Sequence, residues 1–167
     1  MKAFLVVISL VICQSGFAQK SLRQLLDVYN SHSVSYISVQ GLKQRIANNN
    51  AVAILDAREI DEYQISHIPG AIYVGYRDFS KEQIGIDLAG KHTPIVVYCS
   101  LGVRSEVIAE RLQKMGYTNV KNLYGGIFEW KNNGYAVINK SGEATEQVHV
   151  FNNHWGQWLL KGEKVYE

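Results

Sequence analysis

One cysteine in this sequence is placed where a thiol could react. Cys99 follows the apolar run Ile95–Tyr98, which is typical of a buried strand, and precedes a segment with helical spacing that ends at Gly116. The thiol is therefore expected at the carboxyl end of a strand, beside a helix N-terminus whose free N–H groups favour anions. Arg104 adds a full positive charge and a planar set of N–H donors. Together these features favour the thiolate, which is the nucleophilic form of cysteine.

The residues around Cys99 distinguish a reactive thiol from a structural one. An isolated cysteine is most often a small buried apolar residue. Here Gly102 permits a tight turn, and the backbone N–H groups of residues 100–104 can surround a sulfur anion and offset its charge. We therefore predict that Cys99 is a catalytic nucleophile and that Arg104 assists it, either by binding an anion or by bracing the loop.

Composition limits the class of protein. The chain has 167 residues, a formal net charge of +2 and 47% hydrophobic residues. This balance gives no reason to expect a nucleic-acid partner, a polybasic membrane surface or disorder. The length suits one domain with a sizeable core.

The N-terminus has the pattern of a secretory signal peptide over residues 1–18. Lys2 precedes an apolar run over residues 3–12 that is too short to span a bilayer, and small residues place a cleavage site after Ala18. We expect export, to the bacterial periplasm, with no stable membrane insertion after cleavage. An uncleaved anchor is the alternative. Lipid attachment at Cys13 is disfavoured because bulky Ile12 precedes it.

Export would leave one cysteine in the mature chain. Removal of residues 1–18 takes away Cys13 and leaves Cys99, so no internal disulfide can form. A lone thiol in an oxidising compartment is a liability unless it has a function.

Strands and helices alternate along most of the chain. This alternation predicts an α/β fold with a mostly parallel central sheet and helices on both faces. Residues 139–146 are predicted to be a polar linker. The predicted strands cover residues 36–39, 51–55, 71–74, 95–98, 119–123 and 148–151, and the predicted helices lie within 20–33, 38–47, 61–63, 80–84, 103–115, 127–133 and 154–160.

Several spaced motifs resemble those of the single-domain rhodaneses, a sulfurtransferase family, and their order along the chain makes the signal strong. The resemblance covers residues 36–138, between an N-terminal helical extension (residues 19–35) and a C-terminal extension (residues 139–167) that is expected to pack on the domain. The matching residues are Leu55-Asp56-Ala57-Arg58-Glu59, Glu62-Tyr63, His67-Ile68-Pro69-Gly70-Ala71, Cys99 through Ser105, Leu123-Tyr124-Gly125-Gly126, Trp130 and Gly134.

The resemblance implies the three-layer rhodanese-like fold and a double-displacement reaction. Cys99 would take the outer sulfur of a donor anion such as thiosulfate, become a persulfide, and pass the sulfur to a thiol, cyanide or protein acceptor. No cofactor is implied. Asp56 and Arg58 would help shape the pocket, with a purely structural ion pair as the alternative. The predicted substrate-binding residues are Ser100, Leu101, Gly102, Val103, Ser105, Arg58 and Asp56.

Other residues that could take part in catalysis or ligand binding are interpreted as structural. The resemblance makes His67 a turn residue beside Pro69 and Gly70. His149 and His154 have no metal-ligand spacing with each other or with Cys99, so no metal site is expected. The pair at positions 125 and 126 is predicted to serve backbone packing beside the site.

Two functions are alternatives to sulfur transfer. Protein tyrosine phosphatases place five residues between cysteine and arginine, whereas four separate Cys99 from Arg104. The shorter loop favours sulfur over tetrahedral phosphate. The second alternative is an exported rhodanese-fold sulfur carrier or partner-binding module with little turnover.

Two features bear on specificity. Ser100, Leu101 and Val103 carry no charge, whereas thiosulfate-preferring rhodaneses often have basic residues there, so the sulfur donor is left open. Trp155 and Trp158 lie outside the family pattern and are expected to pack on the edge of the sheet.

Overall fold

The computed structural model describes residues 21–80, 88 and 90–166. The predicted signal peptide and most of the helix predicted over 80–84 lie outside the described residues. No helix in the described ranges combines the length and apolar character needed to cross a membrane.

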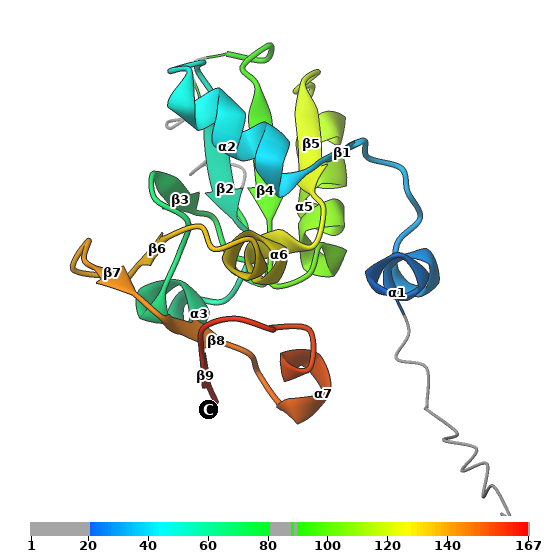
Figure 1. Ribbon diagram of the computed structural model, residues 1–167. Coiled ribbons are helices and arrows are strands. Elements are labelled where there is room, and N and C mark those ends of the chain that lie inside the picture. Colours follow the sequence, from blue (N-terminus) through cyan, green and yellow to red (C-terminus); the bar gives the residue numbers. More distant parts are fainter. Residues whose placement is uncertain (1–20, 81–87, 89, 167) are drawn as a thin grey trace, which may run out of the picture.

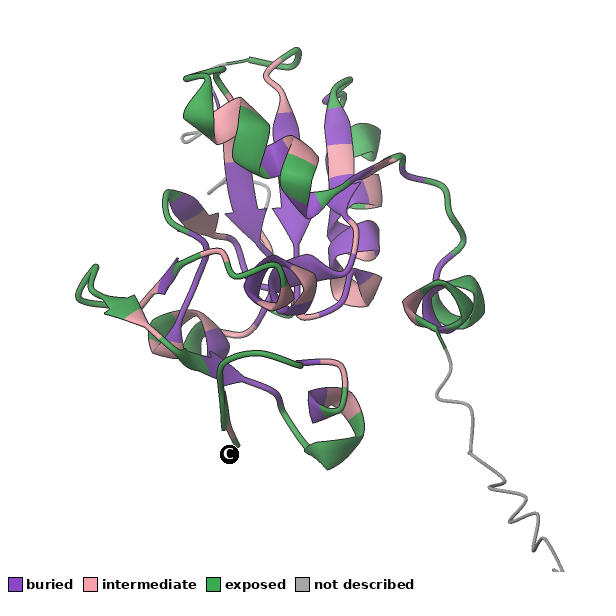
Figure 2. Ribbon diagram, in the orientation of Figure 1, coloured by how far each residue is buried: buried purple, intermediate pink, exposed green. Residues whose placement is uncertain are grey.

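A five-stranded parallel sheet forms the centre of the fold, as predicted (Figure 1). The strand order is β1-β5-β4-β2-β3, and Leu55 of β2 lies opposite Val97 of β4. Every residue of β4 is buried, which explains its uninterrupted apolar sequence (Figure 2). The strands are β1 (Tyr36–Ile37), β2 (Ala53–Asp56), β3 (Ala71–Tyr73), β4 (Ile95–Tyr98) and β5 (Val120–Leu123).

Helices cover both faces of this sheet and complete three layers (Figure 1). On one face, α2 (Val39–Ala47) and α6 (Gly126–Asn132) bury Leu42 and Phe128 against Val96. On the other face, α5 (Val103–Lys114) buries Ile108 and Leu112 against Val97. The helical spacing of these apolar residues was the signal for each helix.

The shorter helices begin at identifiable caps. Ser21 caps α1 (Leu22–Tyr29) with a capping box that includes Gln24. Ser38 accepts a hydrogen bond from the Gly41 N–H at the start of α2. In α3 (Ile60–Ile65), Glu62 accepts a hydrogen bond from the Glu59 backbone N–H. This contact fixes the position of a carboxylate that is important in the site below.

The C-terminal extension contains more structure than the sequence predicted. Residues 139–146 are not simply a linker, because β6 (Val137–Ile138) and β7 (Ala144–Thr145) pair as a hairpin. Asn139 accepts hydrogen bonds from the backbone of Ser141 and Glu143 and stabilises its turn. The short β9 (Glu163–Val165), which was not predicted, pairs in parallel with β8 (Gln147–His149).

The extension packs on the domain, but not on the edge of the sheet as expected. It lies near α3 and α6, beyond the carboxyl ends of β2 and β4 (Figure 1). Val148 and Val150 join the same buried cluster as Tyr98 and Leu101. The apolar residues of the C-terminal extension predicted that it packs on the domain. The surface against which it packs depends on long-range contacts. The last helix is α7 (Asn153–Gly156).

Candidate active site

Cys99 lies where β4 ends, at the start of the cysteine loop (residues 99–105). Its side chain is almost completely buried, with 2% of the residue exposed. The backbone N–H of Gly102 donates a hydrogen bond to the Cys99 Sγ over 3.1 Å, and the Ser105 Oγ lies 3.5 Å from the same sulfur. Gly102 has a φ of 114°, a backbone conformation that would be strained for a residue with a side chain. The loop thus directs polar groups at the sulfur, as predicted.

Two asparagines hold the loop in this shape. The side-chain amides of Asn30 and Asn122 donate hydrogen bonds of 2.9 and 2.8 Å to the Gly102 carbonyl. Ser105 donates a 2.7 Å hydrogen bond to the Asn122 Oδ1. Sequence reasoning missed both asparagines, because neither lies near Cys99 in the chain. Asn30 belongs to the N-terminal extension, which therefore supports the site directly.

The start of α6 supports the loop from another side. The backbone N–H groups of Ile127 and Phe128 donate to the carbonyls of Cys99 and Ser100. This close approach requires glycine at position 126, since a Cβ there would lie 2.2 Å from the Cys99 carbonyl oxygen. The predicted packing role of this glycine is confirmed.

Replacing Gly126 with alanine is expected to displace the cysteine loop and to lower the free energy of unfolding by at least about 3 kcal/mol. A left-handed alanine costs about 1–2 kcal/mol, and the clash with the Cys99 carbonyl adds to it. Gly134→Ala is the matched control, because Gly134 also has a positive φ but a Cβ there meets nothing within 4 Å. Urea denaturation of both variants measures the difference. Equal losses would contradict a special role for Gly126.

Arg104 is engaged by the carboxylate of Glu62, a residue that the sequence analysis matched to a family motif but to which it gave no role. Its two terminal nitrogens contact the Glu62 carboxylate at 2.6 and 2.8 Å, and one of them also donates to the Ser100 Oγ at 3.0 Å. Arg104 was predicted to bind an anion or brace the loop. The geometry matches the brace, because Glu62 already occupies both ends of the guanidinium. Two sequence signals mark Glu62, namely the Glu62-Tyr63 motif and its position three residues after Glu59.

The Glu62–Arg104 pair is electrostatically strong. Burial alone would raise the pKa of Glu62, but the hydrogen bonds and charge of Arg104, with a contribution from Arg58, lower it to about 2. Burial would lower the pKa of Arg104, but Glu62 and the charge of the Cys99 sulfur raise it. Glu62 and Arg104 are therefore both charged at neutral pH, and the cationic group remains next to the sulfur.

Glu62 joins three parts of the chain. It accepts a 3.2 Å hydrogen bond from the Ser100 Oγ, in addition to its contacts with Arg104. The ring nitrogen Nδ1 of His149, on β8 of the C-terminal extension, lies 3.9 Å from its Oε1. Through this one carboxylate, α3, the cysteine loop and the extension meet.

Asp56 and Arg58 form a buried ion pair, and neither is among the described residues that line the two cavities beside the cysteine loop. Both side chains are fully buried, and the Arg58 Nη2 contacts the Asp56 Oδ2 at 2.7 Å. The same nitrogen donates to the Ser66 carbonyl at 2.6 Å. Burial would lower the pKa of Arg58, but Asp56 raises it. Of the two roles weighed for this pair, the geometry fits the structural one, which fastens the end of β2 to the turn after α3.

His67 has a structural role, as predicted, but it lies in a β-bridge just before the turn at Pro69 and Gly70. Its ring stacks on Tyr63 at a centroid distance of 3.9 Å, and its Nδ1 lies 3.0 Å from the Tyr63 carbonyl oxygen. Its backbone bridges to Ile138. The described residues contain no cluster of three or more histidine, cysteine or acidic side chains that could hold a metal ion.

Two cavities adjoin the cysteine loop. One, the tail chamber, has a volume of about 270 Å³ and lies between the loop and the C-terminal extension. Its walls carry loop, extension and neighbouring side chains, namely Glu59, Tyr76, Arg77, Ser100, Leu101, Val103, Arg104, Val150, Phe151 and Trp155.

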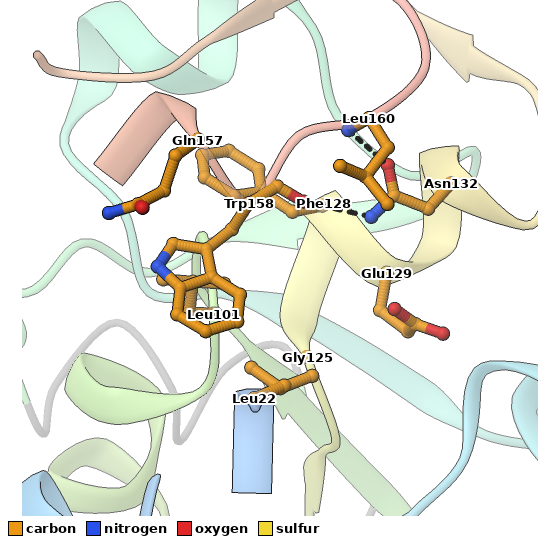
Figure 3. A pocket seen from close by; sticks show the side chains of 9 residues that line it. All are labelled: Leu22, Leu101, Gly125, Phe128, Glu129, Asn132, Gln157, Trp158 and Leu160. Carbon is orange, nitrogen blue, oxygen red and sulfur yellow. Dashed lines mark hydrogen bonds between the residues drawn. The ribbon is translucent and has the colours of Figure 1, made fainter. Parts of the chain in front are cut away.

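The second cavity, of about 300 Å³, meets the loop only at Leu101 (Figure 3). Trp158 lines it, and the Asn132 side chain of α6 bonds to the backbone of Trp158 and Leu160. These bonds fasten the extension beside the site, so both tryptophans expected at the sheet edge instead flank the cysteine loop.

Curated proteins similar to this chain are named as sulfur carriers or sulfurtransferases. The chain is 32% identical over 101 residues to the "Putative sulfur carrier protein YrkF" of Bacillus subtilis, covering 60% of this chain but only 53% of that protein. It is 34% identical over 80 residues to the thiosulfate sulfurtransferase GlpE of Coxiella burnetii, covering 48% of this chain and 72% of that protein. A sulfurtransferase of Allochromatium vinosum is 30% identical over 109 residues, with 65% and 99% covered.

Solved structures share the fold. The rhodanese-like domain of the Alr3790 protein from Anabaena sp. matches with a TM-score of 0.56 and 26% identity, covering 62% of this chain and 78% of that one. A thiosulfate sulfurtransferase from Pseudomonas aeruginosa matches with a TM-score of 0.59 and 24% identity, covering 66% of this chain and 21% of that one. The family model described as "Rhodanese-like domain" matches residues 38–133, more than half of the chain. This protein belongs to the rhodanese-like domain family.

Proposed function

We propose that the protein transfers a sulfane sulfur through a persulfide on Cys99, with thiosulfate as one usable donor. The Cys99 thiolate attacks the outer sulfur of thiosulfate and forms a new S–S bond. The bond between the two sulfurs of the donor breaks, and sulfite leaves with its electron pair. A nucleophilic acceptor such as cyanide or a thiolate then takes the outer sulfur and releases the Cys99 thiolate.

One observation carries this proposal. The Cys99 sulfur lies at a strand end, with the Gly102 N–H directed at it over 3.1 Å and the Arg104 guanidinium beside the same loop. These groups suit the single negative charge of the Cys99 thiolate and of the persulfide that replaces it. The sulfurtransferase names of the Coxiella and Allochromatium relatives agree with the same chemistry.

Thiocyanate formation tests the proposed reaction. Purified protein is incubated with thiosulfate and cyanide, and thiocyanate is measured over time. We expect catalytic turnover, many molecules of thiocyanate for each molecule of protein. Complete absence of thiocyanate would contradict thiosulfate-dependent transfer.

A sulfur carrier with little turnover is a second candidate function. Cys99 is only 2% exposed, so a bound sulfur would be shielded from small acceptors. The name of the Bacillus relative refers to a sulfur carrier. In the same assay a carrier would give at most about one thiocyanate per protein.

We also propose that the protein is exported to the bacterial periplasm and that its signal peptide is cleaved after Ala18, on the sequence pattern of residues 1–18. N-terminal sequencing of protein from the envelope of a bacterial host is expected to begin at Gln19 or its cyclised form. Ala18→Tyr should block cleavage and serves as the control. An intact Met1 on soluble cytoplasmic protein would contradict export.

A further inference from the structure

We propose that the tail chamber binds an apolar organic group of the sulfur donor, so that the protein prefers organic donors to inorganic thiosulfate. The inference rests on the proposed sulfur transfer and adds a substrate class to it. The C-terminal extension supplies the selecting residues, chiefly Phe151 and Trp155. Both lie beyond residue 133, where the match to the family model ends.

The chamber adjoins the cysteine loop, although Cys99 itself is not among its lining residues. Ser100, Leu101, Val103 and Arg104, four residues of the cysteine loop, line one side of it. The second cavity touches only Leu101. A group held in the tail chamber is therefore held against the loop that surrounds the Cys99 sulfur.

The size and lining of the chamber suit a ring. An apolar cavity of about 150 Å³ is enough to bind benzene. The tail chamber has about 270 Å³, which leaves room for a ring and for the charged sulfur group attached to it. Its apolar walls come from both the loop and the extension, as Leu101, Val103, Val150, Phe151, Trp155 and the ring of Tyr76.

The charges around the chamber do not suit a small divalent anion. Arg104 is paired with Glu62 at 2.6 Å, and Arg77 has its Nε 3.6 Å from the Glu59 carboxylate. Arg104 thus already has a close carboxylate partner, and Arg77 is 80% exposed and only loosely paired. Thiosulfate would lose hydration without gaining a buried, unpaired cation. An organic donor with one charge loses less hydration and gains the burial of its apolar part.

The aromatic side chains of the extension are held in place around the chamber. Trp155 packs edge-on against Tyr29 at a centroid distance of 5.7 Å. Phe151 has a φ of 66°, a left-handed conformation that bulky residues rarely adopt, and yet it is 48% exposed. Its ring packs against His149, whose Nδ1 lies near Glu62. The fold thus keeps an exposed aromatic residue in a strained conformation at the chamber wall, which is typical of a functional position.

Benzenethiosulfonate is a suitable probe, because it differs from thiosulfate by a phenyl ring in place of one oxygen. The Cys99 thiolate attacks its terminal sulfur and forms an S–S bond. The bond to the sulfonyl sulfur breaks, and benzenesulfinate leaves with the electron pair. The product on Cys99 is the same persulfide. Because the two donors also differ in charge and in leaving group, recognition of the ring is measured by how substitutions in the chamber wall change the donor ratio.

The test compares kcat/KM for the two donors with cyanide as acceptor. We expect the wild-type protein to prefer benzenethiosulfonate by about tenfold or more, the scale on which apolar pockets discriminate. Trp155→Ala and Phe151→Ala should each lower this ratio several-fold, and Trp155→Phe should retain most of it. Tyr166→Ala is the control, because Tyr166 is an exposed aromatic residue of the extension that does not line the chamber.

Three results would overturn the inference. The first is a ratio near one in the wild-type protein. The second is a ratio that neither alanine variant changes. The third is an equal gain for both donors in those variants, which would show that the extension merely obstructs the loop.

Calorimetric binding of benzenesulfinate separates this inference from the proposed function. Binding that depends on Trp155, in a protein that transfers sulfur from neither donor, would contradict the proposed function while leaving the chamber as a ring-binding site. Absence of such binding in a protein that does transfer sulfur would contradict the chamber alone.

Discussion

Replacing Cys99 with serine is expected to reduce thiocyanate formation by at least about a thousandfold. A serine hydroxyl is hardly ionised at neutral pH, and loss of a nucleophile removes the covalent route altogether. The thiol is buried in a loop held by asparagine hydrogen bonds to the Gly102 carbonyl and by backbone hydrogen bonds from α6, none of which involves the Cys99 side chain. The fold should therefore be retained. The assay is thiocyanate formation from thiosulfate and cyanide.

Circular dichroism and urea denaturation are the controls for that variant. A folded Cys99→Ser protein with full activity would show that the sulfur is carried elsewhere. In the described part of the chain, Cys99 is the only free cysteine. Such a result would remove the basis of the proposed function.

Replacing Glu62 with glutamine is expected to lower the free energy of unfolding at pH 7 by about 3 kcal/mol. The carboxylate is 3% exposed and the guanidinium of Arg104 is 24% exposed, so solvent screens their interaction weakly. Folding lowers the pKa of Glu62 from 4.5 to about 2, a shift equivalent to about 3 kcal/mol. Removing one partner also leaves the other charge uncompensated. Urea denaturation gives the difference.

The pH dependence of this effect has a definite sign. The stabilisation that comes from a lowered carboxylate pKa is complete at pH values above the pKa of the unfolded state. It is lost as the pH falls through the pKa of the folded state. The stability difference between wild type and Glu62→Gln should therefore be constant above about pH 5 and shrink between pH 5 and pH 2. Asp61→Asn, one residue earlier on the exposed face of α3, should change stability by no more than about 0.5 kcal/mol. A Glu62→Gln protein as stable as Asp61→Asn would refute the assigned role.

The sheet and its helices could be predicted from sequence because their signals are local. Apolar runs such as Ile95–Tyr98 give buried strands, and helical spacing after Gly102 gives α5. The cysteine loop followed from the same logic, since a strand end next to a helix start suits a reactive anion. Local signals also gave His67 a structural role beside the turn at Pro69 and Gly70.

The partners of the loop could not be predicted, because tertiary contacts choose them. Asn30 and Asn122 lie 69 and 23 positions from Cys99, and nothing in their own neighbourhoods marks them as loop supports. Glu62 belongs to a family motif, but its pairing with Arg104 depends on the fold. The location of the C-terminal extension depended in the same way on packing between distant segments. The donor preference that we infer for this protein depends on these contacts between distant segments.

Mass spectrometry of the peptide that contains Cys99 tests the central claim most directly. Purified protein is treated with thiosulfate, alkylated and digested without reductant. The account predicts that this peptide gains the mass of one sulfur atom and loses it again after cyanide is added. A Cys99 peptide that never carries the extra sulfur, while thiocyanate is still produced, would contradict the account.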